Sequence, residues 1–421
     1  MPPCTGLPQR FRLRLPFSLM AARLSRLFGI CALAGGSIVF TLGVFELVLR
    51  WLGYEAIYEV YSHPEIFWQR DELLGWSHQP NSQGMYVGPR PWPVEFEAPV
   101  QINSLGLRGP EIAELPDAGY RVLVLGDSLV AGFEVPYEES FQALLEAELN
   151  RLFDFPVQVI NGGVRGYGTD QSYLYYRERG RALRPDLVMF LHGGNDAADN
   201  ITLHRMRRTF SKGALAPGSN GKLERVGYPI PSYPLCSEYA LDPGFAPRRV
   251  DTSFESAMCD VQTRLADRSA LFTVLSERIR RNPALLLFLY RLGTPSEAAE
   301  IPPPAGGGDG SVDGPAGQLA PRFQLTGAIL HALAREVRES GAELLLPVIP
   351  AYWEQLEPEA FAGEGVVLFD IALDLGRPEL HFDKDSHLNR EGHRAFEKVI
   401  APAVAERIRA RRRVAGPSGS P

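Results

Sequence analysis

The sequence predicts an α/β fold in which a doubly wound, parallel, five-stranded sheet is flanked by helices, preceded by an N-terminal transmembrane helix and a small β-rich collar. Three observations support this fold class. Short apolar runs alternate with helix-like segments after residue 120, as is typical of parallel sheets. A long uncharged stretch lies near the N terminus. The segment between these two regions is rich in aromatic residues, Pro and Gly.

The length and charge of the chain narrow the range of functions. The 421 residues could form several domains or one α/β domain with insertions. Lys and Arg total 43 against 50 Asp and Glu, so the formal net charge is -7. This balance argues against general nucleic-acid binding.

The N-terminal region has the pattern of a membrane anchor. Residues 1–26 contain five arginines and no acidic residue, and Leu27–Phe45 is uncharged. The apolar stretch continues past Glu46 to Trp51, which is long enough to cross a bilayer. The positive-inside rule then places the N terminus in the cytoplasm and the chain after about residue 52 across the membrane. A buried core helix and a cleaved signal peptide are the alternatives.

The next segment, 53–119, is predicted to be the collar. Its short alternating pieces, such as "VEFEAPVQIN", favour one or two antiparallel hairpins over helix.

Five strands and several helices are predicted after residue 120. The apolar runs of the first two strands are "RVLVL" and "VQVIN", and the third is "DLVMF". The last two are "AELLLPV" and "VVLFDI". Helical spacing of apolar residues predicts helices at 140–153, 171–183 and about 390–413, and 354–361 is helix-like.

A long insertion separates the third and fourth strands. It spans about 197–341 and includes a predicted helix at 269–292. Its Pro- and Gly-rich part, about 295–320, has the composition of a disordered linker, with a hinged lid arm as the alternative. The predicted organisation is therefore a cytoplasmic tail (1–26), an anchor (27–52), the collar (53–119), a domain with this insertion (120–413) and a disordered tail (414–421).

Two of the four cysteines lie beyond the predicted span. Cys236 and Cys259 would face an oxidising compartment, which favours a disulfide, although two unpaired buried thiols are also compatible with the sequence.

Polar and glycine-rich blocks follow the predicted strands. Ser128 ends "GDS" after the first strand, "NGGVRG" follows at 161–166, and "GGND" at 193–196. "DSH" at 385–387 comes after the last strand. In a parallel sheet these carboxyl ends meet at one edge. A hydroxyl nucleophile, backbone N–H and amide donors, and an Asp/His pair are the groups that acyl transfer requires.

These four blocks, in this order, resemble the SGNH, or GDSL-type, hydrolase superfamily. The resemblance covers about 120–400 and implies that Ser128 is the nucleophile and His387 the general base. It also implies an oxyanion hole formed by the backbone N–H groups of Ser128 and Gly166 and the side chain of Asn195. Alternatively, Asn195 could cap a helix and Gly166 could serve a turn. The superfamily's chemistry needs no metal or cofactor, and no metal-binding spacing is evident.

One position departs from the usual pattern of the superfamily. Its acid normally lies three residues before the histidine, where this chain has Lys384. Asp385 is the predicted acid because some envelope polysaccharide-modifying branches resemble the D-x-H form, and Asp383 remains the alternative. Asp127 is predicted to be structural. His192 and His393 are predicted to be packing or hydrogen-bonding residues.

The resemblance and the anchor together imply a serine esterase held in the inner (cytoplasmic) membrane of a bacterium by a single helix, with its catalytic domain outside the cytoplasm. The expected substrate is an ester, with O-acetyl groups on an envelope or secreted polysaccharide as the expected class. An O-acyltransferase on the same substrates, and a catalytically silent polysaccharide-binding scaffold, are the alternatives. The sequence does not predict the oligomeric state.

Overall fold

The computed structural model describes most of the chain, and a few segments are left out. The predicted linker at about 295–320 lies outside the described residues, as do the first 16 residues and the last six. The described residues are 17–56, 67–88, 94–116, 119–218, 221–280, 321–353, 356, 358–361 and 365–415.

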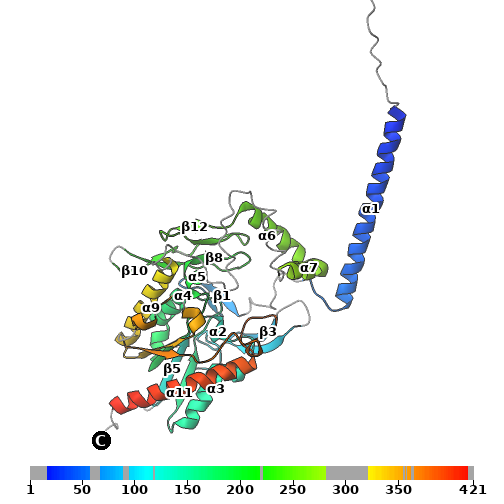
Figure 1. The fold of residues 1–421 in the computed structure, drawn as a ribbon. Coiled ribbons are helices and arrows are strands. Elements are labelled where there is room, and N and C mark those ends of the chain that lie inside the picture. The colour runs from blue at the N-terminus through cyan, green and yellow to red at the C-terminus, as the bar shows by residue number, and fades with distance from the viewer. Residues whose placement is uncertain are drawn as a thin grey trace, which may run out of the picture.

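A five-stranded parallel sheet forms the centre of the body (Figure 1). Its order is β14-β13-β7-β5-β6, and each neighbouring pair is parallel. The chain thus adds one strand on one side of β5 and then three on the other, which confirms the predicted doubly wound sheet. The strands are β5 (Tyr120–Leu125), β6 (Val157–Asn161), β7 (Leu187–Phe190), β13 (Glu343–Val348) and β14 (Val366–Asp370).

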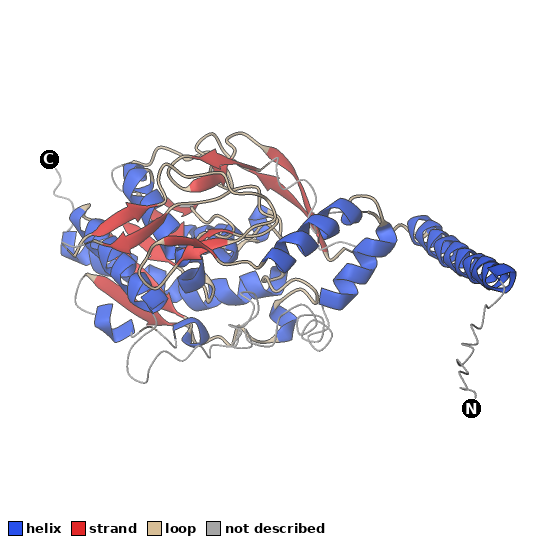
Figure 2. Ribbon diagram, turned by 90° about the horizontal axis from the view of Figure 1, so that it is seen from above, coloured by secondary structure: helices blue, strands red, loops and turns tan. Residues whose placement is uncertain are grey.

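Helices cover both faces of this sheet (Figure 2). Val122 and Val124 of β5 pack in one cluster with residues of α3 and α11, and Leu123 and Leu125 pack in another with residues of α4 and α9. All four side chains are completely buried. A strand covered on both faces needs apolar residues at successive positions, which explains the sequence of β5. The covering helices are α3 (Phe141–Leu152), α4 (Thr169–Glu178), α9 (Pro321–Glu339) and α11 (Arg390–Ala415).

The described residues of the predicted β-rich collar form two antiparallel hairpins. Strands β1 (Trp68–Asp71) and β2 (Gly75–His78) form the first, and β3 (Gln83–Gly88) and β4 (Phe96–Gln101) form the second. Their apolar side chains, including those of Tyr86, Phe96 and Val100, share a core with Ala131 and Phe133. The collar therefore packs directly on the segment that follows β5.

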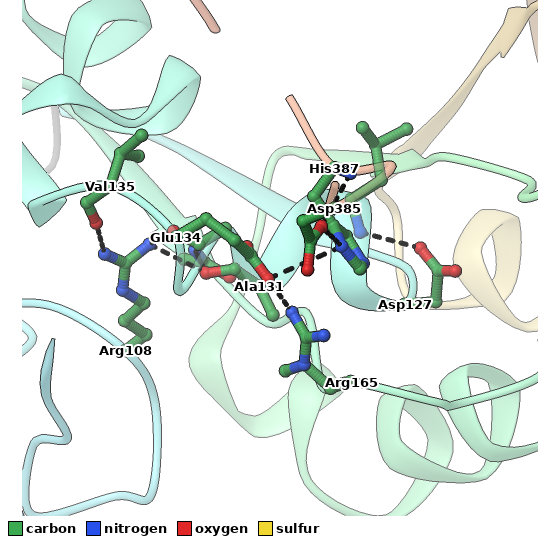
Figure 3. Close-up of polar contacts among 11 residues, drawn as sticks. Arg108, Asp127, Ala131, Glu134, Val135, Arg165, Asp385 and His387 are labelled. Atoms are coloured by element: carbon green, nitrogen blue, oxygen red, sulfur yellow. Dashed lines mark hydrogen bonds and ion pairs between the residues drawn. The ribbon is translucent and has the colours of Figure 1, made fainter. Parts of the chain in front are cut away.

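A buried arginine strengthens this contact. The Arg108 guanidinium donates to the carbonyl of Ala131 at 2.8 Å and also to those of Gly132 and Val135 (Figure 3). Burial lowers the pKa of Arg108 to about 10, so that it stays charged at neutral pH. Because these carbonyls share one cation, the backbone of 131–135 is held in a fixed shape against the collar.

Between α5 and α9, the described part of the insertion forms two small sheets and the helices α6 and α7. Strands β12, β11 and β8 form one antiparallel sheet, and β9 pairs with β10. The last helix of the predicted insertion, α9, instead lies in the body, where it contacts α4 and α5 and covers the sheet. The predicted helix at 269–292 is observed as α7 up to Arg280, and its remainder lies outside the described residues. The insertion elements are β8 (Thr202–His204), β9 (Ala214–Pro217), β10 (Leu223–Val226), β11 (Tyr239–Leu241), β12 (Pro247–Arg249), α6 (Ser253–Ala266) and α7 (Ala270–Arg280).

Shorter elements connect these parts. They are the helices α2 (Ser128–Ala131), α5 (Asp196–Ile201) and α10 (Pro350–Trp353) and the 3₁₀ turns η2 (Tyr137–Glu139), η3 (Gly180–Leu183), η4 (Pro358–Phe361) and η5 (Pro378–Leu380).

The N-terminal helix α1 (Phe17–Trp51) projects away from the body, and its C-terminal part contacts α7 (Figure 1). Its part Arg26–Trp51 has a mean hydropathy of 2.1 and no buried residue in its most apolar window. Within the described residues it is the one helix long and apolar enough to cross a membrane. A signal sequence near the N terminus satisfies the same length and composition, so the predicted anchor remains a proposal.

The structure joins Cys236 and Cys259 in a disulfide, with a Cα–Cα distance of 5.5 Å. This agrees with the predicted pairing and rules out the alternative of two unpaired thiols. The bond ties the loop before β11 to α6.

We expect Cys236→Ser to lower the free energy of unfolding of the inserted region by about 3 kcal/mol, because the bond closes a loop of 23 residues that is otherwise free in the unfolded chain. Mass spectrometry of unreduced peptides should show the cross-link in the wild type. Two free thiols in protein purified without reductant would contradict the assignment.

Candidate active site

Ser128 lies at a sharp turn between β5 and α2. Gly126 adopts a φ of +153°, and a Cβ there would lie 2.6 Å from Cγ2 of Val130. The Asp127 carboxylate caps α2 by accepting a hydrogen bond from the backbone N–H of Leu129 at 2.9 Å. Asp127 is thus structural, as predicted. The turn leaves Ser128 half-buried at the carboxyl end of the central strand.

Gly166 lies on the loop after β6, and its peptide group is held from the collar. Gly166 has a φ of +74°, so a glycine suits this turn. The indole N–H of Trp76 donates to the Arg165 carbonyl at 3.1 Å. Because C=O and N–H point to opposite sides of a trans peptide, this bond directs the Gly166 N–H away from Trp76.

Asn195 follows β7 and immediately precedes α5, at the N-cap position. Its side chain makes no capping hydrogen bond, so the helix-cap alternative is not observed. Its Nδ2 instead donates to Asp199 Oδ2 at 2.7 Å, and the buried Asp199 also pairs with Arg205. One hydrogen of the Asn195 amide is therefore used for orientation, and the second remains available. Arg205 comes from the insertion, just after β8.

His387 is bound to Asp385, the predicted acid. Asp385 Oδ1 accepts hydrogen bonds from the backbone N–H of His387, at 2.8 Å, and from its Nδ1 (Figure 3). Asp385 is 4% exposed, whereas Asp383 is an exposed residue. The collar also holds this segment, because Glu95 accepts from the backbone N–H groups of Lys384 and Asp385.

The four residues predicted from separate blocks line one cavity of about 340 Å³. These are Ser128, Gly166, Asn195 and His387. The collar adds aromatic side chains to the wall, and the insertion adds a polar and basic side. The collar residues are Trp68, Trp76 and Tyr86, and the insertion residues include Thr202, Arg205, Arg208, Thr209 and Lys212.

A second carboxylate beside His387 was not predicted from the sequence. Glu134 is buried, and its Oε1 lies 3.6 Å from His387 Nδ1 while it pairs with Arg165 (Figure 3). Glu134 is the single acidic residue in the apolar run "LVAGFEVP", and that is the one signal the sequence offers. Glu134 thus links the histidine to the residue that precedes Gly166.

These charges set the protonation of the histidine. Burial lowers the pKa of His387, but the negative charge of Glu134 and the bond to Asp385 together outweigh it, while Arg165 opposes them. The net effect raises the pKa above its ordinary value.

Glu134, Asp385 and His387 also form the one group of potential metal ligands found among the described residues, with ligand atoms within 4.8 Å of one another. The donors are already engaged, because Arg165 pairs with Glu134 and His387 Nδ1 is bonded to Asp385. A guanidinium inside this group disfavours a cation there.

The two histidines that were predicted to have packing or hydrogen-bonding roles, His192 and His393, are observed in such roles. His393 is buried and its Nδ1 accepts from the backbone N–H of Phe141, and burial lowers its pKa to about 3. The buried His192 hydrogen-bonds Asp196 at 3.1 Å. Neither lines the cavity.

Comparison with known proteins agrees with this arrangement. The profile of the GDSL-like lipase/acylhydrolase family matches residues 124–395, which include all of the predicted site residues. The chain belongs to this family. The collar and α1 precede the region that matches the family, and the insertion lies within that region.

Individual proteins match this chain over a short stretch or at low sequence identity. An arylesterase of Vibrio mimicus is 40% identical over 80 residues, which are 19% of this chain, and the chain spans 39% of the length of that relative. A psychrotrophic esterase from Pseudoalteromonas aligns with a TM-score of 0.34 at 10% identity, covering 69% of this chain and 98% of the other. An acetyl-xylooligosaccharide esterase from Geobacillus aligns with a TM-score of 0.31 at 12% identity, covering 67% and 93%.

We expect Glu134→Gln to lower the pKa of His387, because the substitution removes the largest influence that raises it and leaves Arg165 without its counter-charge. A titration of the imidazole followed by NMR measures this shift.

Glu138→Gln is the matched control, since it removes an exposed carboxylate from η2, four residues further along the chain. It should leave the pKa of His387 nearly unchanged. An equal pKa in the wild type and in Glu134→Gln would show that Glu134 does not act on the histidine.

Proposed function

We propose that the chain is a serine esterase that works through an acyl-enzyme, with Ser128 as nucleophile, His387 as general base and Asp385 as the acid that orients it. The observation that carries this proposal is the Asp385–His387 pair on the wall of the cavity that Ser128, Gly166 and Asn195 also line.

The hydrogen bonds define the direction of proton transfer. His387 Nδ1 is bonded to Asp385, so Nε2 is the nitrogen left to accept the proton of Ser128. Oγ of Ser128 then attacks the ester carbonyl and forms a tetrahedral oxyanion. Its collapse breaks the bond to the alcohol, which leaves with the proton from His387. A water molecule, deprotonated by the same nitrogen, releases the acid and restores Ser128.

Three donors would stabilise the oxyanion. They are the backbone N–H groups of Ser128 and Gly166 and the free hydrogen of the Asn195 amide. Two of them are fixed from outside the sheet, Gly166 by Trp76 and Asn195 by Asp199. Donors that are held before the reaction need no reorganisation when the charge forms.

The proposed substrate is an acylated carbohydrate, with O-acetyl groups on an envelope or secreted polysaccharide as the class. Support comes from the cavity wall, where Trp68, Trp76 and Tyr86 offer flat apolar faces and the insertion offers polar groups. Sugar rings present both kinds of surface.

The proposed location is the inner (cytoplasmic) membrane of a bacterium, with α1 as a single-pass anchor and the body outside the cytoplasm. The length and hydropathy of Arg26–Trp51 support the span. The arginines before Leu27 support the orientation. The Cys236–Cys259 disulfide fits an oxidising compartment.

We expect Ser128→Ala and His387→Ala each to remove nearly all hydrolysis of a short acyl ester, because general-base assistance contributes roughly 10²–10⁴-fold. Steady-state kinetics of purified variants with native circular dichroism measure this loss. A variant that keeps half of the wild-type kcat would contradict its assigned role.

The acid is tested by a matched pair. Asp385→Asn should lower kcat by orders of magnitude, since the amide cannot hold the histidine in the correct tautomer. Asp383→Asn changes an exposed carboxylate two residues away and should have a small effect. The reverse ranking would transfer the role to Asp383.

Chain length of the carbohydrate should matter. We expect kcat/KM for an acetylated oligosaccharide to exceed that for an acetylated monosaccharide, because additional rings reach the aromatic wall. Trp68→Ala should reduce this advantage and retain activity on 4-nitrophenyl acetate, and Trp68→Phe should preserve the advantage. An advantage that is absent from the wild type, or unchanged in Trp68→Ala, would contradict the carbohydrate proposal.

A further inference from the structure

The outer face of α6 is apolar, and no segment among the described residues covers it. Phe254, Met258, Val261 and Leu265 are 47%, 41%, 50% and 42% exposed. Their spacing of four, three and four residues places them in one stripe along the helix. A patch of large apolar side chains on a helix that faces outward marks an interaction surface.

The opposite face of α6 is firmly attached to the body. Cys259 forms the disulfide with Cys236, and Ser256 Oγ donates to the Cys236 carbonyl at 2.6 Å. The helix therefore cannot turn its apolar stripe inward without breaking these contacts. The stripe must be covered from outside or remain in water.

Hydrogen bonds join the end of α6 to the proposed membrane span. The Glu46 carboxylate of α1 accepts from Ser269 Oγ at 2.8 Å and from the backbone N–H groups of Ala270 and Leu271 at 2.9 and 2.8 Å. Arg50 also donates to the Arg268 carbonyl at 3.0 Å. Glu46 thus caps α7, which begins four residues after the end of α6.

The length of the span places this junction at the membrane surface. The 26 residues of Arg26–Trp51 extend about 39 Å as a helix, whereas the hydrocarbon core is about 30 Å thick. If Arg26 lies at one surface of the hydrocarbon core, about six residues at the other end of the helix extend beyond the core. Glu46 and Arg50 are among these residues. Figures 1 and 2 show α6 and α7 at the end of the body nearest α1.

We infer that the outer face of α6 docks on the lipid bilayer that α1 crosses, with Phe254, Met258, Val261 and Leu265 at the boundary between headgroups and acyl chains. The inference rests on the membrane anchoring in the proposed function. Leu275 of α7, the helix that contacts α1, is also exposed, at 49%. Arg264 is exposed and borders the stripe, where it can meet lipid phosphates.

Docking would hold the body in one orientation. The insertion that carries α6 also supplies the polar and basic side of the cavity. Attachment through both α1 and α6 would prevent the body from rotating about the axis of α1. Attachment through α1 alone would leave the body free to rotate.

The test uses the full chain in vesicles of phosphatidylethanolamine and phosphatidylglycerol, with Cys4 and Cys31 replaced by Ser. A nitroxide is attached to Val261→Cys, and its relaxation is measured with oxygen, which concentrates in lipid, and with a water-soluble nickel complex. Phe40→Cys, inside the span, and Glu391→Cys, on the exposed start of α11, are the references. Unreduced peptide maps must show the Cys236–Cys259 bond.

We expect the label at Val261 to favour oxygen over nickel, as at Phe40 and opposite to Glu391. A water-like label at Val261 with a lipid-like label at Phe40 would overturn the docking and leave the anchor intact. A label at Val261 shielded from both reagents would also overturn it, because a protein segment would then cover the stripe. A water-like label at Phe40 would contradict the anchor itself. Ester hydrolysis is measured separately in the same sample, so that the proposed esterase activity is tested independently of the membrane position.

Discussion

The hydrogen bond between His387 Nδ1 and Asp385 is the interaction on which the proposed chemistry depends. It is available because Asp385 also accepts from the backbone N–H of His387, so that the carboxylate folds onto the residue two positions later. This local turn replaces the longer spacing that is usual in the superfamily. The bond leaves Nε2 as the nitrogen that can serve Ser128, and every later step uses that nitrogen.

The groups around this pair come from outside the matched family region as well as from within it. Glu95 of the collar binds the backbone of the Asp385 segment, and Trp76 fixes the peptide before Gly166. From the insertion, Arg205 pairs with Asp199 and thereby orients Asn195. The collar and the insertion therefore both contribute to the proposed active site, because each fixes the position of one part of the proposed oxyanion hole.

Much of the fold could be predicted because strands buried on both faces have distinctive apolar runs, as in β5 and β6. Ser128, Gly166, Asn195 and His387 could be predicted because each follows a strand in a recognisable block. Glu134 and the Asp199–Arg205 pair could not, since they meet the site only through folding and belong to no short pattern. Arg165 lies within the block "NGGVRG", but its pairing with Glu134 depends on folding. The helix α9 was assigned to the insertion because its place in the body depends on contacts with α4 and α5 that are distant in sequence.

The central claim is that Ser128 is a nucleophile activated by His387. Labelling with a fluorophosphonate, followed by peptide mass spectrometry, tests it most directly because the reagent forms a stable bond only with an activated serine. The account predicts one modified residue, Ser128, with labelling lost in Ser128→Ala and strongly slowed in His387→Ala. Labelling of a different serine, or the absence of labelling in folded wild-type protein, would contradict it.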